Sequence, residues 1–396
     1  FDTICDSTEK RQEDVQGLAA GVDAVIVVGG RTSGNTRRLY EIACRSGKPA
    51  FHVESEADLN GIDLRPLLTA RTIGISAGAS TPNWVIRKVI VGLETRLFRQ
   101  RSPLHRAVHT LMHTALLTNL VVAVAAGGLC YAAAQLQAVG PRLPFVLMAF
   151  LYVQSMHIFN HLTGSRADRY NDPDRAKFYE RHRTALTAAA LVCGAVGLLI
   201  AFSQGLLPFM VLLVMSLTGL SYNLYLIPKC FAGLRFRRIR DIPGSKTVLI
   251  ALAWAVATAA LPALSQAAVL YSWTHAAVFL WTAGLVFVRT AFFDILDMQG
   301  DRLVGKETIA ILLGEKKSLR LLKQLLIVLI AGLPLTAAFG LAPGLAVALA
   351  ACPACMLAII LAYEKGAILP GLRLEFWVES HLLLGGVLAL AWAWLR

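Results

Sequence analysis

Apolar and polar positions divide the chain into two unlike parts. Residues 1 to about 100 mix charged and apolar positions, whereas nearly everything after Thr110 alternates long apolar runs with short basic segments. An apolar run of about 20 residues is long enough to cross a bilayer as a helix. We therefore predict an all-α polytopic membrane bundle of nine transmembrane helices, at residues 110–137, 143–163, 184–204, 206–226, 247–265, 275–293, 321–341, 343–363 and 377–395.

The first part of the chain has the pattern of a parallel β-sheet. Residues 24–30 form a continuous apolar run, which is typical of a strand buried on both faces. Residues 49–53 and 72–78 are further strand-like runs, and a polar turn with a helical pattern follows the first and the third run. This order predicts βαβ units of an α/β fold that make up part of a domain.

Basic residues separate the two parts and then mark one side of the membrane. We place a basic linker at residues 98–108, between an N-terminal segment at 1–97 and a membrane domain at 109–396. Lysine and arginine then fall mainly in alternate connections between spans, which predicts a cytoplasmic N-terminal segment and a C-terminus outside. The net charge of +13 thus serves membrane topology and gives no support for nucleic acid as a partner. A hydrophobic content of 56% excludes a purely soluble enzyme.

The cysteines do not predict a disulfide framework. There are seven of them, an odd number scattered along the chain. Cys352 and Cys355 form a C-x-x-C pattern inside an apolar run, with no second pair and no histidine nearby in the sequence. Packing is therefore the favoured interpretation of this pair. Cys44 lies in a helical pattern and is also interpreted as a packing residue.

Three aspartates that follow the apolar run at 275–293 are the most informative feature of the sequence. Asp294, Asp297 and Asp301 have the spacing i, i+3, i+7, which places them on one face of a helix where it meets water. Carboxylates so close together repel one another unless a cation lies between them. Mg²⁺ carrying a diphosphate fits this requirement, because it prefers carboxylate and phosphate oxygens. The alternative is a solvated acidic helix end.

Two turns of the first part place small polar residues at helix N-termini. Free backbone N–H groups and the helix dipole make such ends suitable for binding anions. Ser33, Asn35 and Ser80 can add side-chain hydrogen bonds to a phosphate. Ordinary helix capping is the alternative, with Ser80 or Thr81 as the cap of the second helix and Pro82 in its first turn.

Three motifs in the first part resemble one enzyme family. "FDTICDSTEKRQ", "VVGGRTSGNTRRLYEIA" and "GISAGASTPNWVI" are similar, in this order, to the C-terminal third of 4-hydroxy-3-methylbut-2-enyl diphosphate reductase, the IspH/LytB family. The resemblance implies that Cys5 ligates a [4Fe-4S] cluster and that ferredoxin or flavodoxin supplies electrons. It also implies that Ser33, Asn35 and Ser80 hold the substrate diphosphate.

That family needs two more cysteine ligands and an acidic proton donor, which this segment lacks. The chain also begins at Phe1 rather than at methionine. We therefore expect a fragment whose start lies upstream, with reductase activity only in the full-length polypeptide.

The acidic cluster belongs to a longer motif, residues 294–308, that resembles the second aspartate-rich motif of the UbiA prenyltransferase superfamily. Nine spans, an outside C-terminus and "SYNLYLIPK" before a basic loop also fit that family, over residues 108–396. The resemblance implies Mg²⁺ held between two acidic motifs, clamping a prenyl diphosphate whose prenyl group passes to a lipophilic acceptor. Tyr225, Lys229 and Arg235 are candidate contacts of the diphosphate. Arg289 needs a partner inside its span, either a motif aspartate or the substrate phosphate.

The first acidic motif departs from the family pattern Asn-Asp-x-x-Asp-x-x-x-Asp. The match here keeps Asn160 and Asp168, whereas His161 and Gly164 replace two carboxylates. The resemblance implies that Asn160 and Asp168 bind Mg²⁺ opposite the second motif. His161 either contributes directly to the site or is a structural histidine at a helix end.

These features together predict a fused isoprenoid enzyme of the bacterial inner membrane. Its membrane part would be a Mg²⁺-dependent prenyltransferase in the lipid bilayer, and its first part would belong to a reductase. The first acidic motif lacks two of the carboxylates of the family pattern. This loss motivates an alternative, in which the membrane part is a catalytically weakened anchor or lipid-binding module that tethers the reductase. A transporter is disfavoured, because the sequence shows no inverted repeat.

Overall fold

A computed structural model gives the fold of the chain and divides it into two compact units. Unit 1 comprises Phe1–His113 and Leu369–Leu372, and unit 2 comprises Thr114–Ile368 and Arg373–Arg396. For residues 6–10 and 168 only the backbone is described. The residues that the structure describes are 6–100, 102–140, 142–164, 168–222, 242, 244–264 and 272–395.

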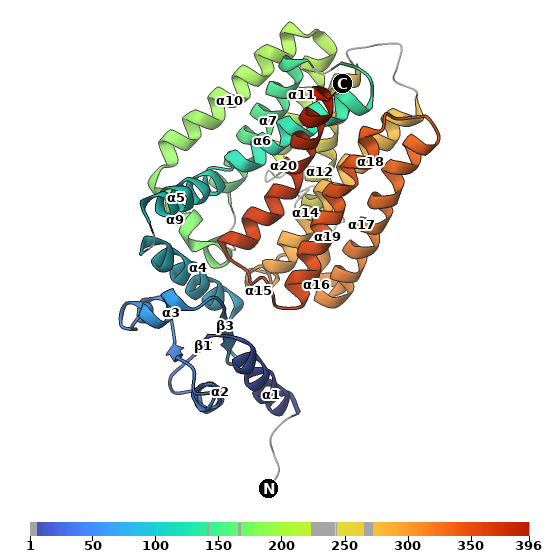
Figure 1. The fold of residues 1–396 in the computed structure, drawn as a ribbon. Coiled ribbons are helices and arrows are strands. Elements are labelled where there is room, and N and C mark those ends of the chain that lie inside the picture. Colours follow the sequence, from blue (N-terminus) through green and yellow to red (C-terminus); the bar gives the residue numbers. More distant parts are fainter. Residues whose placement is uncertain are drawn as a thin grey trace, which may run out of the picture. The chain divides into compact units, whose positions relative to one another are not determined.

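Unit 1 contains a three-stranded parallel sheet in the order β2-β1-β3, so the predicted parallel sheet is confirmed. The strands are β1 (Ala24–Val28), β2 (Ala50–Val53) and β3 (Ile73–Ala77). The helices of this unit, shown in Figure 1, are α1 (Asp6–Gly21), α2 (Gly34–Arg45), α3 (Arg65–Thr69) and α4 (Asn83–Arg99), with a 3-10 turn at Glu56–Asn60.

Strand β1 is central, and its side chains alternate between two hydrophobic clusters. Ala24, Ile26 and Val28 face α3, α4 and the 3-10 turn, whereas Val25 and Val27 face α1 and α2. All five residues are fully buried, because helices cover both faces of the sheet. This explains why β1 is a continuous apolar run in the sequence rather than an alternating one.

Asp23 fixes the start of β1 to the start of β3. One carboxylate oxygen accepts hydrogen bonds from the backbone N–H of Thr72 at 2.9 Å, the Thr72 hydroxyl at 3.0 Å and the backbone N–H of Arg71 at 2.9 Å. These bonds, the Thr72 backbone bond first, hold the pKa of Asp23 below its usual value of 3.8. The bonds favour the ionised form, so their stabilisation is present above pH 3.8 and is lost as the pH falls through the lower folded-state pKa.

We therefore expect the Arg71 and Thr72 amides to lose hydrogen-exchange protection below pH 3.8, after correction for intrinsic exchange rates. Asp23→Asn should lower their protection at neutral pH and remove its pH dependence. Asp63→Asn is the matched control, because among the described residues the Asp63 carboxylate bonds only within its own turn, to Arg65. Protection that falls equally with pH in Asp23→Asn would contradict the assignment.

Unit 2 is built from long apolar helices. A short helix α5 (Pro103–Leu117) leads into it, and Figure 1 shows its longer helices side by side. Its helices are α6 (Leu120–Leu136), α7 (Leu143–Leu162), α8 (Asp168–Asn171), α9 (Pro173–Arg181), α10 (Arg183–Ser203), α11 (Leu206–Ser221), α12 (Ser245–Ala255), α13 (Leu261–Leu264), α14 (Trp273–Leu296), α15 (Met298–Leu303), α16 (Ile309–Leu313), α17 (Glu315–Ala338), α18 (Leu345–Leu349), α19 (Ala351–Glu364) and α20 (Leu372–Trp394).

Nine spans are not confirmed. Among the described residues, seven helical segments are long and apolar enough to cross a membrane, and the bent pair α5 and α6 would make eight. This pair bends by 74° at Asn119, whose φ of 60° interrupts the predicted span at 110–137. Helix α11 is a shorter apolar helix of 16 residues, and the rest of the predicted span at 206–226 lies outside the described residues.

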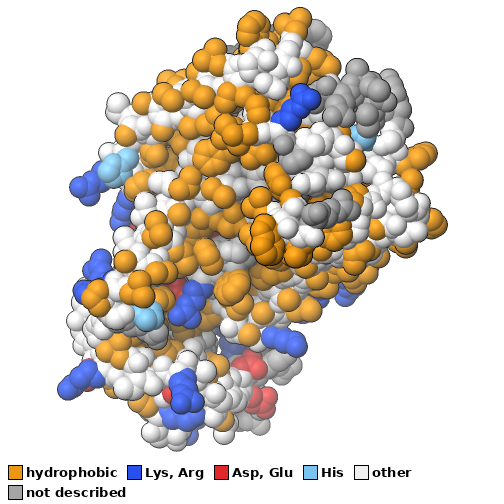
Figure 2. Space-filling view, turned by 45° about the horizontal axis from the view of Figure 1, so that its top comes forward, with side chains coloured by type: hydrophobic (Ala, Val, Ile, Leu, Met, Phe, Trp, Pro, Cys, Tyr) orange, Lys and Arg blue, Asp and Glu red, His pale blue; other side chains and the backbone are white. Residues whose placement is uncertain are grey.

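The outer surface of unit 2 is apolar, as expected for a protein solvated by lipid. Figure 2 shows hydrophobic side chains spread over its helices. Leu191, Leu199 and Phe202 of α10 are each more than half exposed, as are Val214 and Leu217 of α11. Exposed apolar surface on this scale is unfavourable in water and favourable in a bilayer. Unit 2 is therefore a multi-pass membrane domain.

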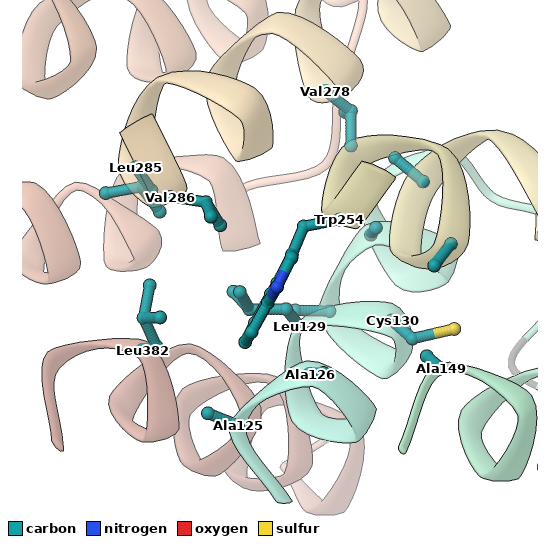
Figure 3. Close-up of a cluster of buried hydrophobic side chains, with 14 of the residues drawn as sticks. Ala125, Ala126, Leu129, Cys130, Ala149, Trp254, Val278, Leu285, Val286 and Leu382 are labelled. Carbon is teal, nitrogen blue, oxygen red and sulfur yellow. The ribbon is translucent and has the colours of Figure 1, made fainter. Parts of the chain in front are cut away.

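The interior of unit 2 combines small residues with a few large ones. Figure 3 shows Trp254 of α12 among Leu129, Val286 and the alanines of α6. Helices α6 and α20 approach at Gly128 and Gly386, where a Cβ on Gly386 would lie 2.7 Å from the Gly128 Cα. Such close backbone contact is typical of membrane helices, which gain stability from tight packing rather than from a hydrophobic effect.

Candidate active site

The second acidic motif spans the end of α14 and the start of α15. Asp294 is buried in the last turn of α14, Asp297 is the half-buried residue between the two helices, and Asp301 is buried in α15. The motif therefore does not follow one continuous helix, as its spacing had suggested. Asp294 and Asp301 point into the protein, so a fully solvated acidic helix end is excluded for these two residues.

Polar partners from other elements hold these two carboxylates. Asp294 Oδ2 accepts a hydrogen bond from the Thr247 hydroxyl of α12 at 2.6 Å. Asp301 Oδ1 accepts hydrogen bonds from Asn171 Nδ2 and from Lys306 Nζ, each at 3.1 Å. The negative charges are thus placed by residues distant in sequence.

Positive charge gathers at the same end of the bundle. Lys246 directly precedes Thr247, which bonds Asp294, and Lys306 Nζ lies 3.1 Å from Asp301 Oδ1. Lys306 forms an ion pair with Asp301, whose side chain is only 4% exposed. Two ammonium groups and two buried carboxylates therefore share one region, which is suited to an anion that binds together with a cation.

A cavity of about 300 Å³ opens between α7, α11 and α12. His157, Asn160, Tyr222 and Lys246 supply its polar groups. The remaining wall is mainly apolar, and it consists of Tyr152, Val153, Met156, Phe159, Val214, Met215, Leu220, Leu249, Ile250, Leu252, Ala253, Trp254 and Val256 with Thr163, Thr218 and Gly219. The start of α12 links the cavity to the acidic motif, because Lys246 lines the cavity and its neighbour Thr247 bonds Asp294.

The residues expected to bind Mg²⁺ do not form a preformed cage in the described part of the chain. No group of three or more His, Cys, Asp or Glu side chains among the described residues is arranged to hold a metal. Asn160 is exposed and lines the cavity. The side chain of Asp168 is not among those that the structure describes. The donor set still fits Mg²⁺, which usually binds through one or two carboxylates together with phosphate oxygens and water.

Arg289 has a different partner from the expected motif aspartate. Its Nε donates to Glu379 Oε2 of α20 at 3.0 Å, and a second nitrogen donates to Glu379 Oε1. The two side chains are only 8% and 2% exposed. Of the two expected partners, the motif aspartate was therefore wrong, because α20 brings a carboxylate that lies 90 residues away in the sequence.

The connection from α8 to α9 was missed by sequence reasoning as a site element. Asn171 bonds Asp301, while Asp172 caps α9 by accepting from the Arg175 N–H at 3.1 Å. The Arg175 guanidinium also pairs with Glu375 of α20. The only signal in the sequence was the Asp172-Pro173 pair, which is typical of a helix start.

His161 packs against α9. Its ring lies 5.1 Å from the ring of Tyr179, whose hydroxyl accepts a hydrogen bond from Asn119 Nδ2 at 2.7 Å. This contact favours the structural interpretation of His161 over a direct role. Four predicted site residues lie outside the described residues: Cys5, Tyr225, Lys229 and Arg235.

The two polar turns of unit 1 meet at the carboxyl edge of its sheet. A Cβ on Gly29, at φ 146°, would lie 2.6 Å from Thr81 Oγ1 and 2.9 Å from Thr36 Oγ1. Hydroxyl groups from both turns therefore crowd the ends of β1 and β3. The Thr81 hydroxyl donates to the Val28 carbonyl at 3.2 Å, and Pro82 is the N-cap of α4, so the expected cap by Ser80 or Thr81 was wrong.

The three candidate phosphate contacts of unit 1 differ in their environments. Ser33 is the N-cap of α2, and its hydroxyl accepts from the Thr36 N–H at 3.4 Å. Asn35 Oδ1 is buried and accepts no hydrogen bond from the described residues. Ser80 is exposed beside the same edge. Ser33 therefore has the capping role that was the alternative to phosphate binding.

Comparison with known protein families yields two matches. The family model described as LytB protein matches residues 1–94, and the one described as UbiA prenyltransferase family matches residues 120–369. Over 92 residues the chain is 51% identical to 4-hydroxy-3-methylbut-2-enyl diphosphate reductase of Anaeromyxobacter sp. (strain K), an overlap of 23% of this chain and 32% of that relative. The chain thus spans about a third of the length of the curated relatives it matches.

Two solved structures are similar to the second part of the chain. A UbiA homolog from Aeropyrum pernix K1 is 18% identical with a TM-score of 0.48, covering 67% of this chain and 96% of that chain. A UbiA homolog from Archaeoglobus fulgidus bound to GPP and Mg²⁺ is 15% identical with a TM-score of 0.48, covering 70% and 98%.

Proposed function

Because the chain belongs to the UbiA prenyltransferase family, we propose that unit 2 transfers the prenyl group of a prenyl diphosphate to a lipophilic acceptor in a Mg²⁺-dependent reaction. Both family resemblances predicted from sequence motifs are confirmed by the family matches. The observation that carries the proposal is the burial of Asp294 and Asp301 beside Lys246 and Lys306, next to a largely apolar cavity.

The cavity would bind the prenyl chain of the substrate, and the acidic motif would bind its diphosphate through a cation. A prenyl chain is apolar, so the apolar wall of the cavity, which includes Met156 and Trp254, would hold it and keep water from its reactive allylic carbon. Lys246 lines the cavity and precedes Thr247, which bonds Asp294, so it can bind the diphosphate end. Lys229, Arg235, Tyr225 and Arg289 are proposed as further contacts of the substrate.

The acidic residues would hold the cation that accompanies the diphosphate. Asp294, Asp297 and Asp301, with Asn160 and Asp168, are the proposed ligands of Mg²⁺, which when bound supplies positive charge for the departing pyrophosphate. Thr247 and Asn171 fix the orientation of two of these carboxylates before substrate arrives. Lys306 balances the charge of Asp301 in the absence of another cation.

We propose that unit 1 belongs to a reductase of isoprenoid biosynthesis that is active only as a longer polypeptide. Cys5 is its proposed [4Fe-4S] ligand, and Ser33, Asn35 and Ser80 are its proposed diphosphate contacts. Electrons would come from a ferredoxin or a flavodoxin. We place the protein in a bacterial inner membrane, with unit 1 in the cytoplasm and the C-terminus outside, because basic residues fill alternate connections between spans.

The decisive experiment measures Mg²⁺ dependence. The purified full chain, incubated with labelled geranylgeranyl diphosphate and membrane lipids, should release pyrophosphate and form a prenylated lipid that mass spectrometry identifies. EDTA should abolish this transfer, and added Mg²⁺ should restore it, because the carboxylates alone repel the diphosphate. Ca²⁺, which is larger and less demanding in geometry, is the control cation.

The loss of two carboxylates from the first acidic motif favours a second candidate function, a membrane anchor or lipid-binding module that tethers the reductase. His161 supports it, because its ring packs on Tyr179 where the family has a carboxylate. An anchor would bind the prenyl diphosphate without Mg²⁺, and this binding would survive Asp297→Ala. The transferase requires that Asp297→Ala abolish binding.

A further inference from the structure

The segment from the end of α8 to the first turn of α9 is fixed against two other parts of unit 2. Asn171, the last residue of α8, bonds Asp301 of α15, and Arg175 in the first turn of α9 pairs with Glu375 of α20. This segment follows the first acidic motif directly, so it occupies the side of the site from which a first acidic motif would face the second. What it presents to Asp301 is a neutral amide rather than a carboxylate.

Asn171 is built tightly into this position. The residue is 9% exposed, and its Nδ2 lies 3.1 Å from Asp301 Oδ1, although the two residues are 130 positions apart. A Cβ on Gly300 would lie 1.8 Å from Asn171 Oδ1, so any side chain at position 300 would displace the amide. The amide is therefore held by its hydrogen bond to Asp301 and packed closely against Gly300.

The hydrogen bonds on Asp301 leave one of its oxygens available. Asn171 Nδ2 and Lys306 Nζ both donate to Oδ1, and Oδ2 receives no hydrogen bond from the described residues. Two donors on one oxygen fix the rotation of the carboxylate about its Cβ–Cγ bond. The direction in which Oδ2 points is therefore set by Asn171 and Lys306 together.

We propose that Asn171 is a positioning residue of the acidic motif: its amide turns Asp301 so that Oδ2 is presented to a divalent cation. This inference rests on the proposed function, since it assigns Asp301 to the cation. Asn171 contributes a hydrogen-bond donor where the family motif would contribute further negative charge, so it orients Asp301 without repelling it.

The test uses the purified full chain in detergent and Mn²⁺ as the probe, with binding followed by electron paramagnetic resonance. Asn171→Ala should weaken Mn²⁺ binding about tenfold, which is the effect of losing a hydrogen bond to a charged group. Gly300→Ala should weaken it similarly, because the new methyl group displaces the amide. In the Asn171→Ala background, Gly300→Ala should have no further effect, since nothing remains to displace.

Gln137→Ala is the matched control. Gln137 is another buried amide, 5% exposed, and it donates to the Ala259 carbonyl at 3.2 Å, at the opposite end of α6 from Asn119. This variant should change thermal stability without changing Mn²⁺ affinity.

Two results would overturn the inference: unchanged Mn²⁺ affinity in Asn171→Ala while Asp301→Asn loses it, or additive effects of the two substitutions. A wild-type chain that binds Mn²⁺ without prenyl transfer would contradict the proposed function alone, because the affinity of Asn171→Ala would still decide the positioning role. A wild-type chain that binds no Mn²⁺ even with geranylgeranyl diphosphate present would overturn both.

Discussion

Replacing Asp301 by asparagine should lower kcat/KM for prenyl transfer by about 10²–10³-fold, the effect of removing one preorganised electrostatic group from an active site. The substitution keeps the shape of the side chain and removes its charge. Lys306 then loses its ion-pair partner at 3.1 Å, and the motif loses a cation ligand. Steady-state kinetics at saturating Mg²⁺, with labelled prenyl diphosphate and product analysis, measure the loss.

Glu364→Gln is the matched control for this substitution. Glu364 is also a carboxylate paired with a lysine, Lys323, at 2.7 Å, but both side chains are 29% exposed and the pair includes no residue of the acidic motif. Surface pairs of this kind contribute little, about 0–1 kcal/mol. Transfer by Glu364→Gln should therefore match that of the wild type. If Asp301→Asn kept activity within about tenfold of the wild type, the cation-binding role of the motif would be untenable.

The membrane helices could be predicted from the sequence because the bilayer imposes a length of apolar chain. Where the structure differs from the predicted spans, one cause is backbone geometry. The run at 110–137 is apolar throughout, yet Asn119 adopts a left-handed conformation and breaks it into α5 and α6. Asparagine tolerates that conformation better than most residues, but hydropathy carries no signal of it.

The acidic motif was found by its spacing, whereas its environment was not predictable. Spacing along one helix gives no information on a helix end, so the break after Leu296 was missed. The partners come from distant segments: Thr247 lies 47 residues from Asp294, and Asn171 lies 130 residues from Asp301. Contacts over such separations depend on how helices pack, which a single sequence does not reveal.

The same limitation applies to Arg289, for which the need for a partner was correctly predicted. A lone arginine in a span requires a counter-charge, but the nearest candidates in sequence were the motif aspartates. Glu379 supplies this counter-charge from α20, which was predicted from the sequence only as an apolar span at 377–395. The physical requirement could be predicted, whereas the identity of the partner depended on the fold.

Replacing Glu379 by alanine should destabilise unit 2 by about 3–5 kcal/mol, because it leaves a buried arginine without a counter-charge. Arg289 and Glu379 are 8% and 2% exposed, so water cannot replace the lost partner. Thermal unfolding in detergent micelles, or titration with a denaturing detergent, measures the change. Glu364→Ala, which breaks the partly exposed pair with Lys323, should lower the free energy of unfolding by no more than about 1 kcal/mol.

The double substitution Arg289→Met with Glu379→Leu should restore most of this stability, because apolar side chains of similar size often replace a buried ion pair without loss. This variant also separates the two roles open to Arg289. A stable protein that has lost prenyl transfer would show that the guanidinium contacts substrate as well as Glu379. A stable and fully active protein would show that Arg289 serves only to join α14 to α20. Equal unfolding midpoints for Glu379→Ala and the wild type would contradict the buried pair itself.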